Sequence, residues 1–218
     1  MMIRVIGKNN SVFNQFMAEL RDVSIQTDRL RFRRNLERLG EIFAYEISKE
    51  MAYNEVEVTT PLGSLLINLP AEQPVLATIL RAGLPIHQGL LNYFDKADSA
   101  FISAYRKYSK SKEFNIKLDH ISTPDLTGRV LIISDPMLAT GGSLTASLKG
   151  LFEKGIPKKI HIVAAVASEE GINKVKRSFS LMDITFWLGA IDDELTVQAY
   201  IVPGLGDAGN LAYGEKDN

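Results

Sequence analysis

The stretch RVLIISDPMLATGGSLTAS, residues 129–147, decides how the rest of the chain can fold. Its apolar run 130–133 predicts a buried strand, which Asp135-Pro136 ends, and Gly141-Gly142-Ser143 then opens a helix. Backbone N–H groups at a helix N-terminus bind phosphate, and a carboxylate at a strand end accepts hydrogen bonds from hydroxyl groups. The stretch therefore predicts a site for a phosphorylated sugar.

Strands and helices alternate on both sides of this stretch. Further strands are expected at 75–80, 100–105, 160–167 and 184–189, and helices at 86–94, 141–154 and 171–177. This alternation predicts an α/β fold with a mainly parallel sheet and helices on both faces, whose ligands bind outside the carboxyl ends of the strands. We expect residues 1–218 to form a single domain.

The N-terminal part adds helices and a β-hairpin. Helices are expected at 12–20 and at 28–51, the second from apolar residues that recur every three or four positions. A hairpin of strands 56–58 and 65–69 is a plausible subunit arm. Five arginines lie at the start of the second helix: Arg29, Arg31, Arg33, Arg34 and Arg38. Because acidic residues share their face, a solvated surface is the simplest interpretation, with a subunit contact or a regulatory anion site as alternatives.

Two later segments are predicted to be loops. Residues 106–117 carry four lysines and an arginine, which makes this loop cationic, and residues 200–214 are rich in glycine. The tail 214–218 is expected to be exposed to solvent. His87, His120 and His161 are scattered without triad or metal spacing, and each is expected to be a core or surface histidine.

Composition narrows the class of protein. The 218 residues are 45% hydrophobic and 23% charged, with a formal net charge of -1, which is typical of a globular protein and makes nucleic-acid binding unlikely. The absence of cysteine excludes disulfides, thiolate nucleophiles and cysteine metal sites. The sequence shows neither a signal peptide nor a membrane span, so we expect a cytoplasmic protein with no membrane partner.

The turns after consecutive strands converge in such a sheet, so Arg81, Arg106 and Asp135 are expected to meet. The N–H groups and hydroxyls of residues 140–143 suit a monoester phosphate, to which the helix dipole adds a favourable potential. The forked donors of Arg81 and Arg106 suit a second anion such as diphosphate. Asp135 would also favour positive charge that develops on a ribose ring during a dissociative substitution.

Four motifs resemble those of a known family. DPMLATGGS at 135–143 is similar to the phosphoribosyl diphosphate (PRPP) motif of type I phosphoribosyltransferases, in the wording of the uracil phosphoribosyltransferase family. ILRAGL at 79–84, YIVPGLGDAGN at 200–210 and TPLG at 60–63 resemble further signatures of that family, and LRD at 20–22 extends the similarity weakly. The resemblance implies transfer of ribose 5-phosphate from PRPP to N1 of uracil, giving UMP and diphosphate. It also implies Mg²⁺ bound through the diphosphate, and a homodimer or higher homo-oligomer.

The resemblance also implies which residues bind the two substrates. The PRPP contacts would be Arg81, Arg106, Asp135, Pro136, Met137, Leu138, Ala139, Thr140, Gly141, Gly142, Ser143 and Asp207. The uracil contacts would be Ile201, Gly206, Asp207 and Ala208. Asp135, Arg106 and Asp207 would be the catalytic residues, with Asp207 the nearest candidate for a general base and no protein metal ligand expected. Backbone groups of the glycine-rich loop can match the edge of uracil, whereas cytosine reverses the donor and acceptor pattern.

One segment departs from the family pattern. After Arg106 the family has an acidic pair, whereas this chain continues Lys107-Tyr108-Ser109-Lys110, so Lys107 or Lys110 is an alternative contact for the diphosphate. Two other functions remain open: an RNA-binding regulator that keeps the fold, and transfer to a purine. The intact loop at 200–210 favours the uracil enzyme over the regulator. A purine enzyme would be expected to have two adjacent acidic residues where this chain has Ser134-Asp135.

Overall fold

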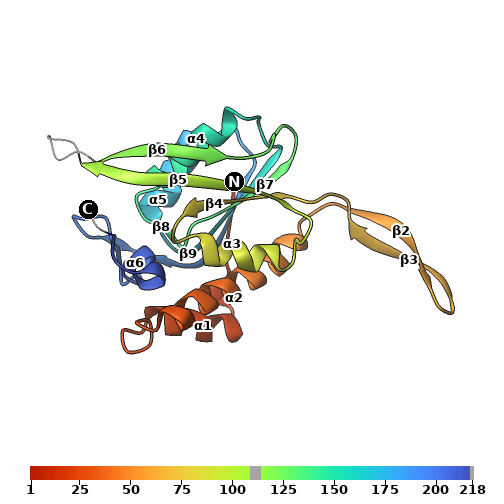
Figure 1. Cartoon of the computed structure of the whole chain (residues 1–218), viewed down its shortest axis with the longest axis horizontal. Helices are drawn as coiled ribbons and strands as arrows, with labels where there is room; N and C mark the ends of the chain where they lie inside the picture. Colours follow the sequence, from red (N-terminus) through yellow and green to blue (C-terminus); the bar gives the residue numbers. More distant parts are fainter. Residues whose placement is uncertain (109–113, 217–218) are drawn as a thin grey trace.

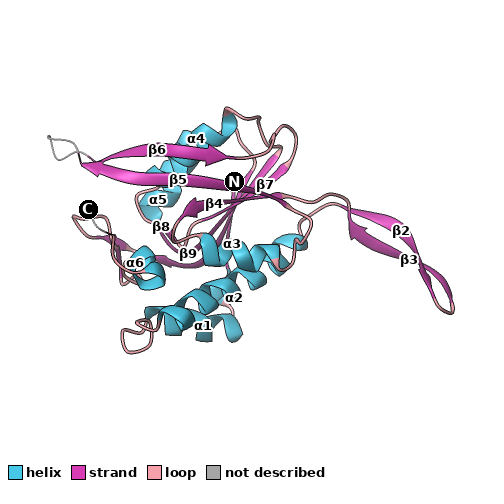
Figure 2. Cartoon of the chain, in the orientation of Figure 1, coloured by secondary structure: helices cyan, strands magenta, loops and turns pink. Residues whose placement is uncertain are grey.

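A single sheet of eight strands carries the fold in the computed structural model, which describes residues 1–108 and 114–216, with only the backbone at 105–108 and 114–117. Seven strands follow one another across it in the order β1 (Met2–Val5), β10 (Ile184–Asp192), β9 (Lys159–Ser168), β7 (Val130–Ser134), β4 (Val75–Leu80), β5 (Asp98–Tyr108) and β6 (Phe114–Ser122). The eighth, β8 (Met137–Leu138), pairs with β9. Every pairing is parallel except β5 with β6 (Figures 1 and 2). The expected mainly parallel α/β fold is confirmed.

Helices cover both faces of the sheet (Figure 1). One face carries α1 (Val12–Arg21), α2 (Arg29–Ser48) and α3 (Leu84–Leu91), and the other carries α4 (Gly142–Phe152) and α5 (Glu169–Ser178). Alternate side chains of β4 explain the two layers: Leu76 packs with α1–α3, and Val75 and Ala77 pack on the opposite side. No helix in the described ranges is long and apolar enough to cross a membrane.

Short polar residues start the helices that the sequence predicted. Ser11 Oγ accepts a hydrogen bond from Phe13 N at 3.2 Å, and Asp28 Oδ1 accepts one from Arg31 N at 3.0 Å. The apolar residues that predicted the second helix are all buried in α2: Phe32, Leu36, Leu39, Phe43 and Ile47. The remaining elements are short: η1 (Ile6–Lys8), β11 (Glu194–Leu195), β12 (Ile201–Val202) and α6 (Ala208–Tyr213).

Two loop predictions were wrong. The predicted loop 106–117 is largely an antiparallel ribbon, because β5 continues to Tyr108 and β6 begins at Phe114; residues 109–113 lie outside the described residues. The sequence signal was the alternation of apolar and polar residues from Phe114 to Leu118. The predicted loop 200–214 contains α6, whose N-cap Asp207 accepts a hydrogen bond from Asn210 N at 2.9 Å.

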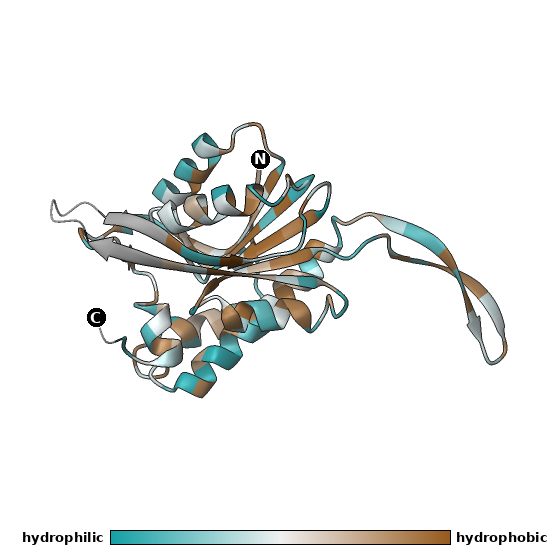
Figure 3. Cartoon of the chain, turned by 45° about the horizontal axis from the view of Figure 1, so that its top comes forward, coloured by the Kyte–Doolittle hydropathy of each residue, from teal (hydrophilic) through white to brown (hydrophobic). Residues whose placement is uncertain are grey.

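The predicted hairpin exists and forms a separate arm, β2 (Tyr53–Thr60) and β3 (Gly63–Pro70), which extends away from the body (Figure 1). Every residue of both strands is exposed. The register pairs Val56 with Ile67 and Val58 with Leu65, so these four apolar side chains share one face of the arm. Figure 3 shows apolar residues along this arm.

The arginines at the start of α2 mostly bind other protein groups. Arg34 forms an ion pair with Glu37 at 2.6 Å, and Arg38 donates to Asn35 Oδ1 at 3.0 Å. Arg33 donates to the Ala212 carbonyl at 2.7 Å, which ties α6 to α2. Arg31 pairs with Glu19 at 2.7 Å and joins α2 to α1. These contacts favour a structural and surface role over a regulatory anion site.

The Glu19 contact predicts a pH dependence of stability. Hydrogen bonds from Arg31 and then Asn35 hold the pKa of the nearly buried Glu19 carboxyl at about 2, below its usual 4.5. A carboxyl whose pKa is depressed by folding stabilises the protein above its unfolded pKa and loses that effect as the pH falls towards the folded value. We expect Glu19→Gln to lower the free energy of unfolding by about 2 kcal/mol at pH 6, and the deficit to shrink between pH 4.5 and 2.

Urea denaturation of both proteins at several pH values measures this difference. Glu46→Gln, which breaks the more exposed pair with Lys49, is the control and should change the free energy of unfolding by less than about 1 kcal/mol. A Glu19→Gln deficit that is equal at pH 6 and pH 2.5 would contradict the assignment.

Candidate active site

The order in which successive strands are added to the sheet changes direction between β4 and β7, which makes this a topological switch point. From β4 the chain passes to β5 on one side, whereas β7, β9 and β10 follow one another on the other side. Ligands of open α/β sheets bind at such a point, outside the carboxyl ends of the strands. Arg81 follows β4 and Asp135 follows β7, so the topology brings both to this edge.

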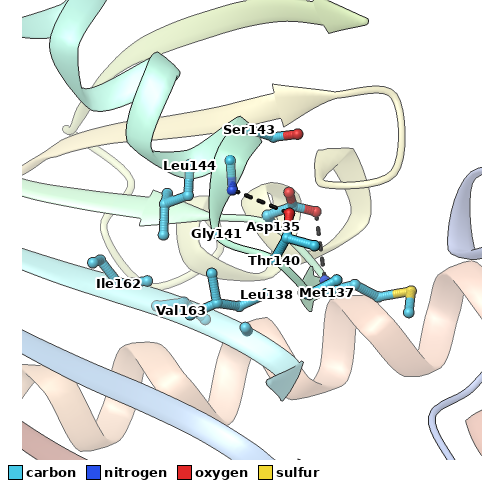
Figure 4. Close-up of a pocket in the computed structure, with 12 residues that line it drawn as sticks. Asp135, Met137, Leu138, Thr140, Gly141, Ser143, Leu144, Ile162 and Val163 are labelled. Atoms are coloured by element: carbon cyan, nitrogen blue, oxygen red, sulfur yellow. Dashed lines mark hydrogen bonds between the residues drawn. The ribbon is translucent and has the colours of Figure 1, made fainter. Parts of the chain in front are cut away.

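A small hollow of about 40 Å³ lies within the loop that follows β7 (Figure 4). The residues that line it are Asp135, Met137–Leu144 and Ile162–Ala164. Within the loop, Thr140 Oγ1 accepts a hydrogen bond from Gly142 N at 3.4 Å, and Asp135 Oδ1 accepts one from Met137 N at 3.5 Å. The loop ends at the N-terminus of α4, where the backbone N–H groups and the helix dipole favour a phosphate.

The start of α5 supports this loop through backbone contacts. Ser168 Oγ donates to the Ala139 carbonyl at 2.6 Å and accepts from Gly171 N at 3.0 Å. Gly141 has a φ of +73°, and a Cβ there would lie 2.7 Å from the Gly171 carbonyl oxygen. Both glycines are therefore required for the close approach of the two segments. The sequence analysis did not identify Ser168 or Gly171 as supports of the loop, because that contact is made only in the folded sheet.

A larger cavity of about 450 Å³ adjoins the loop and collects residues from distant parts of the chain. Its walls come from the turn after β4, the loop after β7 and the C-terminal region. The lining residues are Ile79–Ala82, Ala104, Asp135–Met137, Ala139, Ser143, Ala199–Tyr200, Gly206–Gly209 and Lys216. Most of the residues predicted for the donor and most of those predicted for the base thus line one cavity.

Of the two remaining predicted residues, one is buried in the core and the other cannot be placed. Ile201 is only 3% exposed and belongs to the hydrophobic core on the face of the sheet that α1–α3 cover. Arg106 lies in β5 opposite Ile116, and its side chain lies outside what the structure describes. All the other predicted site residues line the hollow, the cavity or both.

Lys216 and Tyr200 are two of the lining residues that were not predicted as site residues. Lys216 belongs to the tail that was expected to be solvated, and it lines the cavity although it is exposed. Arg81 Nη2 donates to the Gly214 carbonyl at 3.0 Å and so holds the tail at the cavity edge. No local sequence pattern predicts this hydrogen bond. Tyr200 also lines the cavity, and its place directly before the predicted Ile201 was the available signal.

The histidines do not belong to either hollow. His161 Nδ1 accepts a hydrogen bond from Trp187 Nε1 at 2.9 Å, and burial, aided by the charge of Lys159, lowers its pKa to about 3. Burial lowers the pKa of His87 to about 4. Both are neutral core side chains near pH 7, and His120 is exposed, as the sequence predicted.

Comparisons with known sequences agree on one family. A family model described as uracil phosphoribosyltransferase matches residues 8–215. A uracil phosphoribosyltransferase from Porphyromonas gingivalis is 54% identical over 211 residues, which cover 97% of each chain. One from Methanococcus maripaludis is 41% identical over 91% of this chain and 84% of its own. The solved structure of a protein from Aquifex aeolicus matches with a TM-score of 0.86 and 29% identity over the full length of both chains.

The contact between Gly141 and Gly171 predicts a local effect on anion binding. Gly141→Ala should move the loop, and we expect the dissociation constant of ribose 5-phosphate to rise about tenfold or more. Gly128→Ala is the matched control, because Gly128 has a similar φ of +70° but no atom within 4 Å of a Cβ. Each substitution should cost about 1 kcal/mol through its backbone conformation.

Titration calorimetry with ribose 5-phosphate, beside thermal unfolding of both variants, measures the two effects separately. Equal affinity in the two variants would show that the contact does not shape the hollow.

Proposed function

Since the chain belongs to the uracil phosphoribosyltransferase family, we infer that it transfers the ribose 5-phosphate unit of PRPP to N1 of uracil, with UMP and diphosphate as products. The observation that carries this inference is the shared cavity. Asp135–Met137 and Ser143 line it from the loop after β7, and Gly206–Gly209 line it from the C-terminal region. A sugar phosphate bound by the first segment and a base bound by the second would meet inside it.

The proposed reaction breaks the bond from C1 of the ribose to the diphosphate oxygen and forms the bond from C1 to N1 of uracil. The loop 137–144 binds the 5-phosphate at the N-terminus of α4. Asp135 accepts hydrogen bonds from the ribose hydroxyls and stabilises positive charge on the ring as the diphosphate departs. Arg81 binds the departing diphosphate, and we assign the same role to Arg106 on the sequence resemblance.

The base is read by the segment Gly206–Ala208, which offers backbone donors and acceptors to the uracil edge. The buried Ile201 side chain leaves only its backbone for such a role. Cytosine reverses the hydrogen-bonding pattern of that edge and would leave buried groups unpaired. The N1 proton passes to solvent or to Asp207, the nearest carboxylate in this segment of the cavity wall.

The residues present fit a Mg²⁺ ion that arrives with the substrate. The described residues contain no group of three or more histidine or acidic side chains that could hold a metal. Asp135 and Asp207 nevertheless line the cavity, and Mg²⁺ is commonly bound by one or two carboxylates together with substrate phosphates. When bound, the ion supplies positive charge that stabilises the leaving diphosphate oxygens.

The two alternative functions have less support. Arg31, Arg33, Arg34 and Arg38 each contact another protein group, which weakens the case for an RNA-binding surface on α2. Ser134, where a purine enzyme would be expected to carry a second acidic residue, is buried and donates to the Ala77 carbonyl at 3.3 Å. We further propose that residues 1–218 act as one domain and that the protein works in the cytoplasm.

We also propose a homodimer built by the arm β2–β3. An isolated two-stranded hairpin is at best marginally stable in water, and this one exposes Val56, Val58, Leu65, Ile67 and Leu69. The first four form the apolar face defined by the register, on which Leu69 also lies opposite Asn54. A second copy of the chain would cover this face and stabilise the arm.

The activity is tested by product formation. With PRPP, Mg²⁺ and uracil, we expect UMP and diphosphate in equal amounts, and with cytosine or hypoxanthine at least a hundredfold less, because the loop leaves their groups unpaired. Asp135→Asn should lower the kcat with uracil by about 10²-fold or more, since it removes charge from the reacting ring. Liquid chromatography of the products measures both effects.

EDTA in excess of Mg²⁺ is the control for the metal and should abolish turnover. UMP formation that persists in EDTA would contradict the Mg²⁺ proposal. Absence of any nucleotide product with all three bases would contradict the enzyme and leave the regulator.

The dimer is tested by mutation of the apolar face of the arm. Val58→Glu with Ile67→Glu should convert the dimer to a monomer, because both charges would be buried in the interface. Glu57→Lys, on the opposite face, is the matched control and should leave the mass unchanged. Light scattering coupled to size exclusion measures the mass, and a monomeric wild-type protein or a dimeric double variant would contradict the proposal.

A further inference from the structure

Arg21 and Asp192 join the end of α1 to the end of β10 at the carboxyl edge of the sheet. Arg21 Nη1 donates to Asp192 Oδ2 at 2.7 Å, and Arg21 Nη2 donates to Asp192 Oδ1 at 3.0 Å. The Arg21 side chain is 25% exposed and the Asp192 side chain is 7% exposed. Two parallel bonds of this kind fix the orientation of both side chains as well as their separation.

The pair holds the backbone of one residue, Gly204, by both of its polar groups. Gly204 N donates to Asp192 Oδ2 at 2.8 Å, and the Gly204 carbonyl accepts from Arg21 Nη1 at 3.1 Å. The next residue is held from the same region, because Gln26 Nε2 donates to the Leu205 carbonyl at 3.4 Å. Arg21 at the end of α1 and Gln26 in the segment that follows it therefore both hold the turn 204–205 by hydrogen bonds.

This turn leads directly into the part of the loop that lines the cavity, Gly206–Gly209. Neither Arg21 nor Asp192 lines the cavity itself. A loop that reads a base through backbone groups cannot be adjusted by its own side chains, so the path of its backbone decides the fit. The residues that hold Gly204 set that path.

We propose that Arg21 and Asp192 are positioning residues that hold the base-binding loop in register with the cavity and thereby set the affinity for uracil and its discrimination from cytosine. The proposal rests on the proposed function, in which Gly206–Ala208 bind the base. Ile201 and Leu205 already anchor the loop through side chains that are 3% and 2% exposed. Apolar packing is not directional, whereas the charged pair fixes the two hydrogen-bonding groups of Gly204.

A second pair in the same helix separates positioning from stability. Glu19 of α1 receives two hydrogen bonds from Arg31, at 2.9 Å and 2.7 Å, so this pair, like Arg21–Asp192, joins one guanidinium to one carboxylate by two bonds. It joins two helices and does not contact the loop 201–208. Arg31→Gln is therefore the matched control for Arg21→Gln, since each removes a forked donor from a mostly buried carboxylate.

The test compares steady-state kinetics of Arg21→Gln, Arg21→Lys, Asp192→Asn and Arg31→Gln. We expect the uracil KM to rise about tenfold or more in Arg21→Gln and Asp192→Asn, while the PRPP KM changes by less than about threefold. Asp192→Asn would turn an amide N–H towards a donor of Arg21 or Gly204. Arg21→Lys keeps the positive charge but loses the forked pair of donor nitrogens, and it should give an intermediate uracil KM. The ratio of uracil to cytosine turnover should fall in the same order, and Arg31→Gln should leave it unchanged.

Hydrogen–deuterium exchange of the peptide 199–208 provides a readout that needs no activity. Exchange there should be faster in Arg21→Gln and Asp192→Asn than in wild type and Arg31→Gln. Unchanged exchange, or KM shifts no different from those of Arg31→Gln, would overturn the proposal. If wild type makes no UMP, the proposed function fails, and the exchange data still decide whether the pair holds the loop.

Discussion

The parallel hydrogen-bond ladder between β4 and β7 is the constraint on which the site depends. It pairs Val75 with Leu131 and continues to Thr78 with Ser134, so both strands end at the same edge. The turns that carry Arg81 and Asp135 must therefore lie beside each other. Because β9 and β10 extend the same parallel order, Ser168 and Asp192 reach that edge too, although they lie far from Arg81 in sequence.

Residues at that edge support two loops that contribute mainly backbone N–H and C=O groups to the site. Ser168 and Gly171 hold the loop after β7 through the Ala139 carbonyl and the close approach to Gly141. Arg21 and Asp192 hold Gly204 in the same way at the other end of the cavity. In both places a glycine-rich segment provides N–H and C=O groups, and polar side chains from a neighbouring helix or strand end fix where those groups point. The division follows from the chemistry of glycine, which permits close approach but cannot fix its own conformation.

Sequence analysis could predict those features that local patterns encode. The apolar runs predicted the central strands. The turn at 140–143 predicted the phosphate loop, because strand, turn and helix follow one another directly in the sequence. The ribbon β5–β6 was missed because the cationic residues of 106–112 obscured the alternation that begins at Phe114. Helix α6 was missed because glycines dominate its neighbourhood, although Asp207 was its N-cap. The position of Lys216 and the Arg21–Asp192 pair could not be predicted, because they depend on the completed sheet and on contacts between distant residues. Arg81 and Gly214 are 133 positions apart, and Arg21 and Asp192 are 171 apart.

The charges around the cavity suit a substitution in which positive charge appears on the ribose. Among the described lining residues, Arg81 and Lys216 are cationic, and Asp135 and Asp207 are acidic. One donor nitrogen of Arg81 is already hydrogen-bonded to the Gly214 carbonyl. A strongly cationic wall would bind the anionic donor tightly but would oppose the cationic ribose that forms when the diphosphate departs. Backbone N–H groups at the start of α4 avoid this conflict, because they attract the 5-phosphate with partial charges that fade within one helical turn. The proposed Mg²⁺, bound through the diphosphate, would avoid it as well, because its positive charge would be held on the diphosphate and not on the ring.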